Sequence, residues 1–451
     1  MSRVLKFRKG LNIELKGAAE KVLVKIPHAE SYAVNPADFK GLTPRLCVKQ
    51  GDKVKAGSPV FFDKYAPEVA YVSPVAGTVS AINRGERRKL LQVVISPDTE
   101  QTAETYSITP EITASRDKII DLMLKAGYWP FVKQRPYGIV ANPKDKPKAI
   151  FVSGFDTAPL TLDMDFILSG QIENFQKGIN ILGKLTEGKV HLGLSNADTG
   201  SKLPKITGAE ITFYAGKHPA GNVGIHIHHI SPISKGEIVW TIDPQHVAML
   251  GHFFATGIYN AEKIVALCGS EVKRPHYLRI LSGTSLASFG EQVDQDKKRQ
   301  ARYISGNVLT GSDVGANGWL GFYDNRISII PEGNYHEFLG WALPRFKKFS
   351  TSKSYFSWLT PNRKYEPDTN LNGGVRAFVV TNQYEKVLPM DLYPVYLLKA
   401  ILAGDIDKME QLGIYEVIEE DLALCEFVCT SKIEVQTLLR QGIEMMIKEM
   451  S

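Results

Sequence analysis

The sequence is poor in cysteine and in long hydrophobic runs. Its 451 residues include 4 cysteines, too few and too widely spaced for a disulfide scaffold in a chain of this length. Charged residues, glycine or proline interrupt every apolar stretch before it reaches the roughly 18 to 20 residues of a membrane-spanning helix. The basic first residues lack the apolar core of a secretory signal peptide. We therefore expect a folded, reduced protein of the cytoplasm that does not itself cross a membrane.

The excess of positive charge is small. Lysine and arginine number 54 against 48 aspartates and glutamates, a formal net charge of +6. Such an excess suits an anionic membrane surface or an acidic partner better than it indicates nucleic-acid binding. A strip of basic and aromatic residues at 345–358 could likewise stack on bases or contact a headgroup layer or a membrane partner. Since no nucleic-acid module is recognisable, we favour the partner and expect no nucleic acid.

The chain is long enough for about three hydrophobic cores, and its composition is that of an ordinary globular protein. The order of strand and helix patterns predicts an α/β multidomain fold. We assign a barrel-sandwich β module to 1–105, a Rossmann-like α/β domain to 106–257, a β-grasp (SLBB-like) domain to 258–330, a connecting segment to 331–380 and a helical domain to 381–451.

The N-terminal module resembles biotinyl and lipoyl carrier domains. Short β-branched runs between 46 and 95 alternate with turns at Gly51, Gly57 and Pro74, the pattern of a small β-sandwich. Lys64 follows Asp63, as the modified lysine does in lipoyl domains. However, Pro74 lies ten positions after Lys64, whereas a carrier lysine stands at the tip of a tight hairpin. We expect Lys64 to be unmodified, because a carrier role would also leave most of the chain unexplained.

An aromatic loop follows a helix predicted between Ser115 and Gly127. It contains Phe131, Arg135, Pro136 and Tyr137. Aromatic rings on a loop stiffened by proline can face a flat apolar ligand such as a quinone, and they can equally cover a core. The sequence leaves both interpretations open.

The central region predicts a parallel sheet. An apolar strand at 149–153, a turn at 154–159, an amphipathic helix near 166–186 and a strand at 190–195 form a strand-helix-strand unit. A dinucleotide fingerprint needs several glycines, so that the backbone can approach a pyrophosphate. Only Gly154 is present in this turn. We therefore do not expect NAD or FMN to bind in the usual way.

Histidines and cysteines provide weak candidates for a metal site. His226 and His228 would share one face of an extended strand, with His229 beside them, but their spacing supplies no third ligand. Alternating His and Ile is also typical of a half-buried strand, and we favour that interpretation. Cys425 and Cys429 would share a helix face, yet an iron–sulfur cluster needs four thiolates. We expect this pair to pack in a core.

The elements after residue 240 continue the α/β pattern. Asp243 and Pro244 predict the start of a helix that ends at Gly257. Apolar strands near 263–269 and 276–283, followed by a returning strand at 303–311, resemble a soluble-ligand-binding β-grasp domain.

Several motifs, in their order along the chain, resemble the A subunits of the sodium-translocating NADH:quinone reductases nearly from end to end. They are Lys9-Gly-Leu, Pro74-Val-Ala-Gly-Thr-Val, Arg84-Gly-Glu-Arg-Arg, Arg135-Pro-Tyr, Ala149 to Leu160, Gly216 to Gly221, Tyr384 to Asp391 and Glu419 to Cys429. The resemblance extends to the C subunit of the related Rnf complexes, whose cysteine-rich iron–sulfur continuation is missing here. In fold it extends to the NADH-binding subunit of respiratory complex I.

The resemblance implies membership of a six-subunit complex that passes electrons from NADH to ubiquinone and exports sodium ions. NADH, FAD, FMN, riboflavin and iron–sulfur centres would belong to other subunits, so that this chain holds no tightly bound cofactor and is not catalytic alone. Ubiquinone would be its substrate. The chain would lie peripherally on the cytoplasmic face of the bacterial inner membrane, chiefly against the quinone-reducing B subunit in the membrane.

We combine the aromatic loop and the turn after the first central strand into a candidate quinone slot. Arg135 would donate hydrogen bonds to a quinone oxygen as that oxygen gains negative charge. The candidate residues are Phe131, Arg135, Pro136, Tyr137, Gly154, Asp156 and Thr157. Two alternatives remain: a docking protein without a ligand, and a free-standing NADH or flavin dehydrogenase, against which the missing glycines argue.

Overall fold

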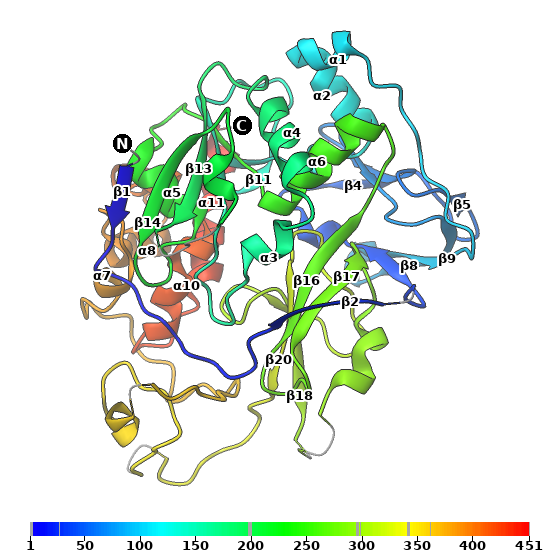
Figure 1. The fold of residues 1–451 in the computed structure, drawn as a ribbon. Helices are drawn as coiled ribbons and strands as arrows, with labels where there is room; N and C mark the ends of the chain where they lie inside the picture. The colour runs from blue at the N-terminus through cyan, green and yellow to red at the C-terminus, as the bar shows by residue number, and fades with distance from the viewer. Residues whose placement is uncertain are drawn as a thin grey trace.

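The computed structural model describes residues 3–26, 28–196, 201–294, 297, 299–340, 343–360 and 362–450. Within these ranges the strands form four sheets of seven, six, four and three strands. Figure 1 shows the two larger sheets at the centre, the N-terminal β module at one side and the C-terminal helices at the other. None of the described helices is both long enough and apolar enough to span a membrane.

The seven-stranded sheet is mostly parallel. Its order is β1 (Arg3–Lys6), β14 (Glu210–Ala215), β13 (Lys189–Ser195), β12 (Ala149–Ser153), β15 (Val239–Thr241), β10 (Lys133–Arg135) and β11 (Ile139–Val140). The pairs from β1 to β15 are parallel, while β10 is antiparallel to both of its neighbours. The predicted parallel pairing of 149–153 with 190–195 is confirmed. The single helix expected near 166–186 is instead two, α3 (Met164–Leu168) and α4 (Ile172–Leu182).

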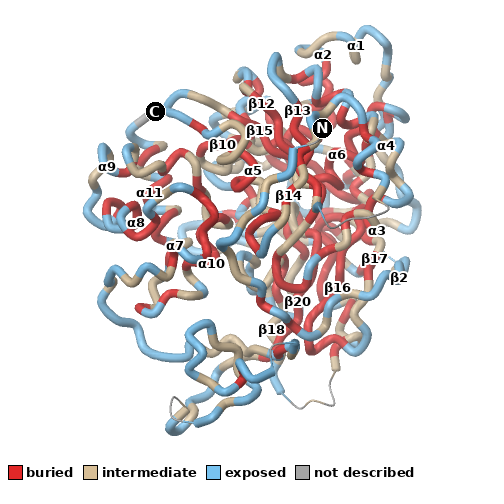
Figure 2. The backbone as a smooth tube through the Cα atoms, turned by 60° about the vertical axis from the view of Figure 1, so that its left-hand side comes forward, coloured by how far each residue is buried: buried red, intermediate tan, exposed pale blue. Residues whose placement is uncertain are grey.

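Each face of this sheet covers a different hydrophobic core. Ile150 and Val152 of β12 belong to the core with α4 and α6 (Pro244–Thr256), whereas Ala149 and Phe151 belong to the core with α5 (Val223–Ile230) and the C-terminal helices. Successive strand side chains point to opposite faces. The continuous apolar run of β12 follows from this double burial. Figure 2 shows the buried residues gathered at the central strands and the helices that pack on them, with exposed residues mainly at the periphery.

Helix α6 begins and ends as predicted. Asp243 occupies its N-cap position and accepts a hydrogen bond from the Gln245 amide at 2.8 Å, and Gly257 ends it with a left-handed φ of 73°. Helix α6 packs tightly against α4. A Cβ atom at Gly251 would lie 1.8 Å from the carbonyl oxygen of Asn174, so only glycine permits this approach.

The N-terminal module has the predicted sandwich of short strands. One sheet has the order β3 (Tyr32–Val34), β9 (Leu90–Pro97), β8 (Gly77–Arg84) and β5 (Lys53–Val54), and the other the order β4 (Pro44–Leu46), β6 (Pro59–Asp63) and β7 (Ala70–Val72). Val60, Phe61, Val79 and Val93 are fully buried between them. The helices α1 (Pro110–Ala114) and α2 (Arg116–Lys125) follow, and α2 starts next to Ser115 as expected.

The six-stranded sheet forms the third domain. Its order is β19 (Ser312–Asp313), β18 (Ala301–Ser305), β20 (Arg326–Pro331), β16 (Glu262–Cys268), β17 (His276–Leu281) and β2 (Glu20–Lys25). Val265 and Leu267 of β16 belong to a separate hydrophobic core within this domain, whereas Ile264 and Ala266 belong to the core that includes α4 and α6. The sheet is therefore packed on one face against the α/β domain.

The N-terminal segment up to residue 25 departs from the predicted domain ranges. The sequence-based ranges place it in the N-terminal module, whereas β1 pairs with β14 of the seven-stranded sheet and β2 pairs with β17 of the six-stranded sheet. Both strands are short and add to sheet edges formed by residues about 200 positions or more away. The local sequence pattern does not predict which sheet a short strand will pair with, because the open edges exist only once the sheets have folded.

The C-terminal residues are helical, as predicted, and a less regular segment precedes them. The helices are α7 (Tyr384–Val387), α8 (Pro394–Ala403), α9 (Ile406–Gln411), α10 (Glu419–Val428) and α11 (Val435–Met450). The described part of 332–380 contains little regular structure apart from the 3-10 turn η7 (Phe356–Leu359). This segment projects at the lower left of Figure 1, and Figure 2 shows it largely exposed.

Short 3-10 turns complete the described elements. They are η1 (Pro36–Asp38), η2 (Glu86–Arg88), η3 (Trp129–Phe131), η4 (Leu203–Lys205), η5 (Leu286–Gln292) and η8 (Ile414–Glu416).

A buried ion pair joins the C-terminal helices to the central sheet. The guanidinium of Arg135, at the end of β10, lies 2.6 Å from Asp421 and 2.6 Å from Glu420, both in the first turn of α10. The side chains of Arg135 and Asp421 are 2% and 0% exposed. Burial opposes the charge on Arg135, but the two carboxylates more than compensate and raise its pKa. Burial raises the pKa of Asp421, and the Arg135 charge opposes that rise.

Removing the guanidinium should destabilise the whole protein. We expect Arg135→Ala to lower the free energy of unfolding by about 3 to 5 kcal/mol, because it leaves the Asp421 charge buried without a partner. Urea unfolding followed by circular dichroism measures this loss. Lys146→Ala, which removes an exposed ion pair with Glu187, is the control and should change little. Equal effects of the two variants would contradict the role assigned to Arg135.

A second polar cluster joins the N-terminal module to the six-stranded sheet. The carboxylate of Asp38 accepts a hydrogen bond from the Phe322 amide at 2.8 Å, and the buried ammonium of Lys263 donates to the carbonyl oxygens of Phe322 at 3.0 Å and Asp324 at 2.5 Å. Burial lowers the pKa of Lys263 to about 8 and raises the pKa of Asp38 to about 7. The loop at 322–324 is thus held both by Asp38 of the N-terminal module and by Lys263 of the six-stranded sheet.

The raised pKa of Asp38 makes stability depend on pH. The folded state resists ionisation of this carboxyl, so stability falls as pH rises from about 4, the pKa in the unfolded chain, through about 7. We expect Asp38→Asn, which keeps an acceptor for the Phe322 amide, to stabilise the protein by about 2 kcal/mol at pH 8, allowing for partial exposure of the carboxylate, and to have little effect at pH 4. Thermal unfolding at the two pH values measures the difference. An equal shift at both would contradict this assignment.

Candidate functional site

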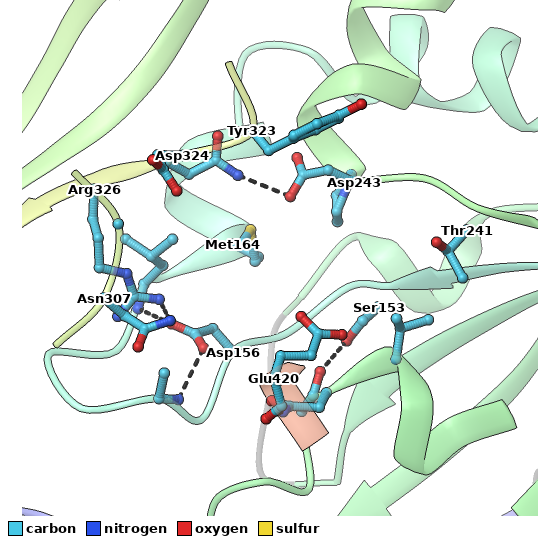
Figure 3. A pocket seen from close by; sticks show the side chains of 18 of the residues that line it. Ser153, Asp156, Met164, Thr241, Asp243, Asn307, Tyr323, Asp324, Arg326 and Glu420 are labelled. Carbon is cyan, nitrogen blue, oxygen red and sulfur yellow. Dashed lines mark hydrogen bonds and ion pairs between the residues drawn. The ribbon is translucent and has the colours of Figure 1, made fainter. Parts of the chain in front are cut away.

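A cavity of about 280 Å³ lies where the α/β domain, the six-stranded domain and the C-terminal helices meet. It opens at the carboxyl ends of β12 and β15, where ligands commonly bind in α/β sheets. Figure 3 shows Asp243, Asp324 and Tyr323 on one side, with Ser153, Asp156 and Glu420 opposite them. The side chains that carry the chemistry of its wall are Phe131, Lys133, Phe155, Asp156, His218, Asp243, His246, Tyr323, Asp324, Asn325, Arg326 and Glu420.

The turn after β12 forms one wall and is held by a charged network. The carboxylate of Asp156 accepts hydrogen bonds from the amides of Ala158 and Leu162, each at 2.9 Å, and forms an ion pair with Arg326. The same guanidinium donates to the carbonyl oxygens of Pro159 at 2.9 Å and Leu160 at 3.0 Å. Arg326 opens β20, so the six-stranded sheet fixes a loop of the α/β domain.

The opposite wall comes from the start of α6 and the segment before β20. The amide nitrogen of Asn325 donates to the Asp243 carboxylate at 2.8 Å, and the hydroxyl of Tyr323 donates to the carbonyl oxygen of Pro130 at 2.6 Å. Burial raises the pKa of Asp243. These bonds hold Asn325 beside the first turn of α6.

A neutral histidine completes the first wall. The Nδ1 atom of His218 lies 3.1 Å from the Thr157 hydroxyl, which also accepts a hydrogen bond from the Gly221 amide at 2.9 Å. Burial lowers the pKa of His218 to about 4. The imidazole is therefore uncharged at neutral pH and can offer both a donor and an acceptor.

A second and larger cavity, of about 810 Å³, adjoins the first. It shares Phe155, Asp156, Leu162 and Met164 with the first cavity and extends to the carboxyl ends of β13 and β14. The turn after β12 therefore separates two hollows at the same edge of the sheet.

The structure brings together some of the predicted quinone-site residues. Phe131 and Asp156 line the first cavity, and Gly154, Asp156 and Thr157 line the second. Arg135, Pro136 and Tyr137 line neither. The Arg135 guanidinium is committed to Glu420 and Asp421, and the Tyr137 carbonyl accepts a hydrogen bond from Arg440 at 3.0 Å. Glu420 does line the first cavity, so Arg135 influences it indirectly.

The predicted strand with aligned histidines is wrong. Residues 223–230 form helix α5, in which His226 and His228 lie about 200° apart around the axis. His226 is buried, bonds the Ala220 carbonyl at 2.9 Å and stacks on Tyr214 with centroids 3.8 Å apart. His228 lies 2.7 Å from Glu416, and His229 lies 2.8 Å from the Pro389 carbonyl. The alternation of His and Ile is misleading because the helix is buried on several sides.

The other candidate residues have ordinary surroundings. Lys64 is exposed just after β6, with its ammonium 5.0 Å from the centre of the Tyr65 ring. Cys425 and Cys429 lie in the core of the C-terminal helices, as expected, and the Tyr384 hydroxyl lies 2.9 Å from the Cys429 sulfur. Burial raises the pKa of the Cys425 thiol, which suits packing rather than reactivity.

Sequence reasoning missed the wall formed by His246 and residues 323–326. These residues carry no motif, and they reach the cavity only because β20 pairs with β16 and places its start beside α6. The one local signal is the run Tyr323-Asp-Asn-Arg326 in a turn before a strand, since polar side chains in such turns are often functional.

Comparisons with known proteins identify all three β-containing parts. Residues 5–98 match the family model of the NqrA N-terminal barrel-sandwich hybrid domain, 114–259 the NqrA second alpha/beta domain, and 264–316 the NQRA C-terminal domain of SLBB type. These matches confirm the predicted barrel-sandwich, α/β and SLBB domains.

The chain also matches whole proteins along almost its full length. It is 38% identical to the A subunit of the Na(+)-translocating NADH-quinone reductase of Neisseria meningitidis serogroup A over 99% of this chain and 100% of the relative, and 38% identical to that of Rhodopirellula baltica over 99% and 98%. A chain of an NAD+-reducing [NiFe]-hydrogenase is similar at 10% identity and a TM-score of 0.37, over 75% of this chain and 62% of that one, too distantly to bear on function. The chain therefore belongs to the family of A subunits of the Na(+)-translocating NADH-quinone reductases.

Proposed function

We propose that this protein takes part in ubiquinone binding within the sodium-translocating reductase, and that the first cavity receives the quinone ring. The observation that supports this most strongly is the combination of aromatic side chains with neutral hydrogen-bonding groups at the carboxyl ends of β12 and β15. Phe131, Phe155 and Tyr323 supply the apolar surface, and His218 supplies a neutral polar group. Small-molecule sites combine these two features. The cavity lies near the lower end of their usual size range, which suits a ring headgroup.

The charges around the cavity support a neutral ligand rather than a nucleotide. The carboxylates in its wall are Asp156, Asp243, Asp324 and Glu420, while the cations are Lys133 and Arg326. Arg326 is already paired with Asp156, and Lys133 lies 4.7 Å from the centre of the Tyr323 ring. A pyrophosphate would meet repulsion here. We accordingly propose that no cofactor binds tightly to this chain, and that NADH, the flavins and the iron–sulfur centres reside on other subunits.

Arg135 acts in this proposal through Glu420 rather than by touching the quinone. Its ion pairs hold the start of α10 against β10, which keeps the Glu420 carboxylate at the wall of the cavity. Arg326 holds the turn after β12 in the same way, through Asp156. The two arginines thus fix the positions of Glu420 and Asp156 in the wall of the cavity.

The segment before the C-terminal helices supports docking on a membrane partner at the cytoplasmic face, chiefly the B subunit of the complex. Residues 343–364 contain six lysines and arginines and no acidic residue. Phe346, Phe356 and Trp358 are each about half exposed, at 53%, 49% and 50%. Exposed aromatic residues next to cations are typical of interfaces. In this proposal the chain positions quinone chemistry that only the assembled complex carries out.

The quinone proposal predicts a specific effect of Phe131→Leu. Losing an aromatic wall should raise both the Kd of a short-chain ubiquinone for the full chain and its KM in the assembled complex by about 3- to 10-fold. Phe254→Leu, a buried change on α6 outside both cavities, is the control and should leave both constants unchanged. Absence of saturable quinone binding in the wild type, or equal effects of the two variants, would refute this site.

The docking proposal predicts weaker assembly without loss of folding. We expect the double variant Phe356→Ser, Trp358→Ser to co-purify with the membrane subunits at less than about half the wild-type yield, while its thermal unfolding as an isolated chain stays unchanged because both side chains are exposed. Tyr65→Ser, which alters a 75% exposed ring on the N-terminal module, is the control. Normal recovery of the double variant in the complex would contradict docking through this segment.

A further inference from the structure

His246 is a buried polar side chain in the cavity wall whose ring nitrogens are unpaired. It lies in the first turn of α6, is 1% exposed, and lines the first cavity. Neither Nδ1 nor Nε2 has a hydrogen-bond partner among the described residues. Buried polar groups are paired in the great majority of cases, so an imidazole left unpaired beside a cavity indicates a group that the cavity is built to receive.

Stacking fixes the orientation of this ring. Phe131 lies parallel to it, with centroids 4.0 Å apart and an interplanar angle of 3°, and Phe322 and Tyr323 pack at 5.8 and 6.1 Å. Aromatic side chains thus occupy the surroundings of the ring, and the hydrogen-bonding nitrogens sit on its edge. Burial, reinforced by the nearby Lys263 and Lys133, lowers the pKa of His246 well below its ordinary value. The ring is neutral and carries one N–H donor.

Asn325 provides a complementary atom at the same place. Its side-chain nitrogen donates to the carboxylate of Asp243, the N-cap residue of α6, while its side-chain oxygen is buried without a partner among the described residues. Asn325 also lines the first cavity and is 8% exposed. The free amide oxygen of Asn325 and the unpaired imidazole of His246 therefore belong to residues that line the same cavity at the start of α6.

We propose that His246 and Asn325 are the polar contacts that recognise the ligand of this cavity, with the imidazole N–H donating to a ring oxygen of ubiquinone and the Asn325 oxygen accepting from a hydroxyl of ubiquinol. This assignment rests on the proposed quinone function of the cavity. An oxygen of either ubiquinone or ubiquinol can accept a hydrogen bond from the His246 N–H. Only the reduced form carries a hydroxyl that can satisfy the asparagine oxygen.

The pair therefore makes the site sensitive to the oxidation state of its ligand. The wild-type site gains a hydrogen bond to a buried acceptor when ubiquinol binds and leaves that acceptor unpaired when ubiquinone binds. Unpaired buried polar groups weaken binding markedly. Loss of the Asn325 oxygen should thus weaken the binding of ubiquinol more than that of ubiquinone.

The test uses the assembled complex and the full chain, with a short-chain ubiquinone and its quinol as probes. We expect His246→Phe, which keeps the stacking on Phe131, to raise the KM and Kd of the quinone about 10- to 100-fold while thermal stability is unchanged or higher, because an unpaired polar group has been removed. Asn325→Leu should raise the inhibition constant of ubiquinol about 10-fold and the quinone KM less than about 3-fold. His191→Phe, a buried histidine stacked on Phe151 outside both cavities, is the control.

The outcomes separate this inference from the quinone site itself. If Phe131→Leu weakens quinone binding while His246→Phe and Asn325→Leu leave quinone and quinol constants unchanged, the cavity binds quinone but this pair does not recognise it. If wild-type protein shows no saturable quinone binding, the proposed function fails first. If His246→Phe does not fold, the test depends on Asn325→Leu alone. A ratio of quinol to quinone affinity equal to that of the wild type would then overturn the inference.

Discussion

The ion pair between Arg326 and Asp156 is the contact on which the geometry of the site depends. It joins the first residue of β20 to the turn after β12, and the same guanidinium holds two carbonyl oxygens of that turn. The turn forms the boundary between the two cavities. Because Arg326 is buried, its charge needs these partners. The position of the six-stranded sheet therefore sets the shape of the cavity.

Buried charges connect the other domains in the same manner. Arg135 binds the start of α10 to the central sheet, and Lys263 holds the loop that Asp38 contacts from the N-terminal module. Such contacts are directional, since each requires a specific partner at hydrogen-bond distance. Hydrophobic cores shared between domains supply most of the adhesion, while the buried charges select one relative arrangement.

The site consequently belongs to no single domain. The α/β domain contributes Phe131, Asp156 and His246, the six-stranded domain contributes Asn325 and Arg326, and α10 contributes Glu420. The carboxyl ends of β12 and β15 would suit a nucleotide in other α/β proteins, yet the wall here is rich in carboxylates and the turn holds one glycine. Our proposal is that a neutral ring with polar oxygens binds here rather than a phosphate, with the unpaired atoms of His246 and Asn325 as its polar contacts.

The sequence by itself determined the order of domains, the family, the strand-helix-strand unit and the ends of α6, because these depend on local periodicity, capping and turn chemistry. It also singled out Phe131 and Asp156, which the structure places in the wall of the first cavity. It did not reveal that residues 3–6 and 20–25 supply strands to two distant sheets, or that 223–230 is a helix. Nor did it reveal that the Arg135 guanidinium forms ion pairs with α10. Only the tertiary structure decided these points, and it alone placed His246 and Asn325 in the wall of one cavity. Each of these outcomes depends on which distant surface packs against a residue, and the local sequence pattern does not specify that surface.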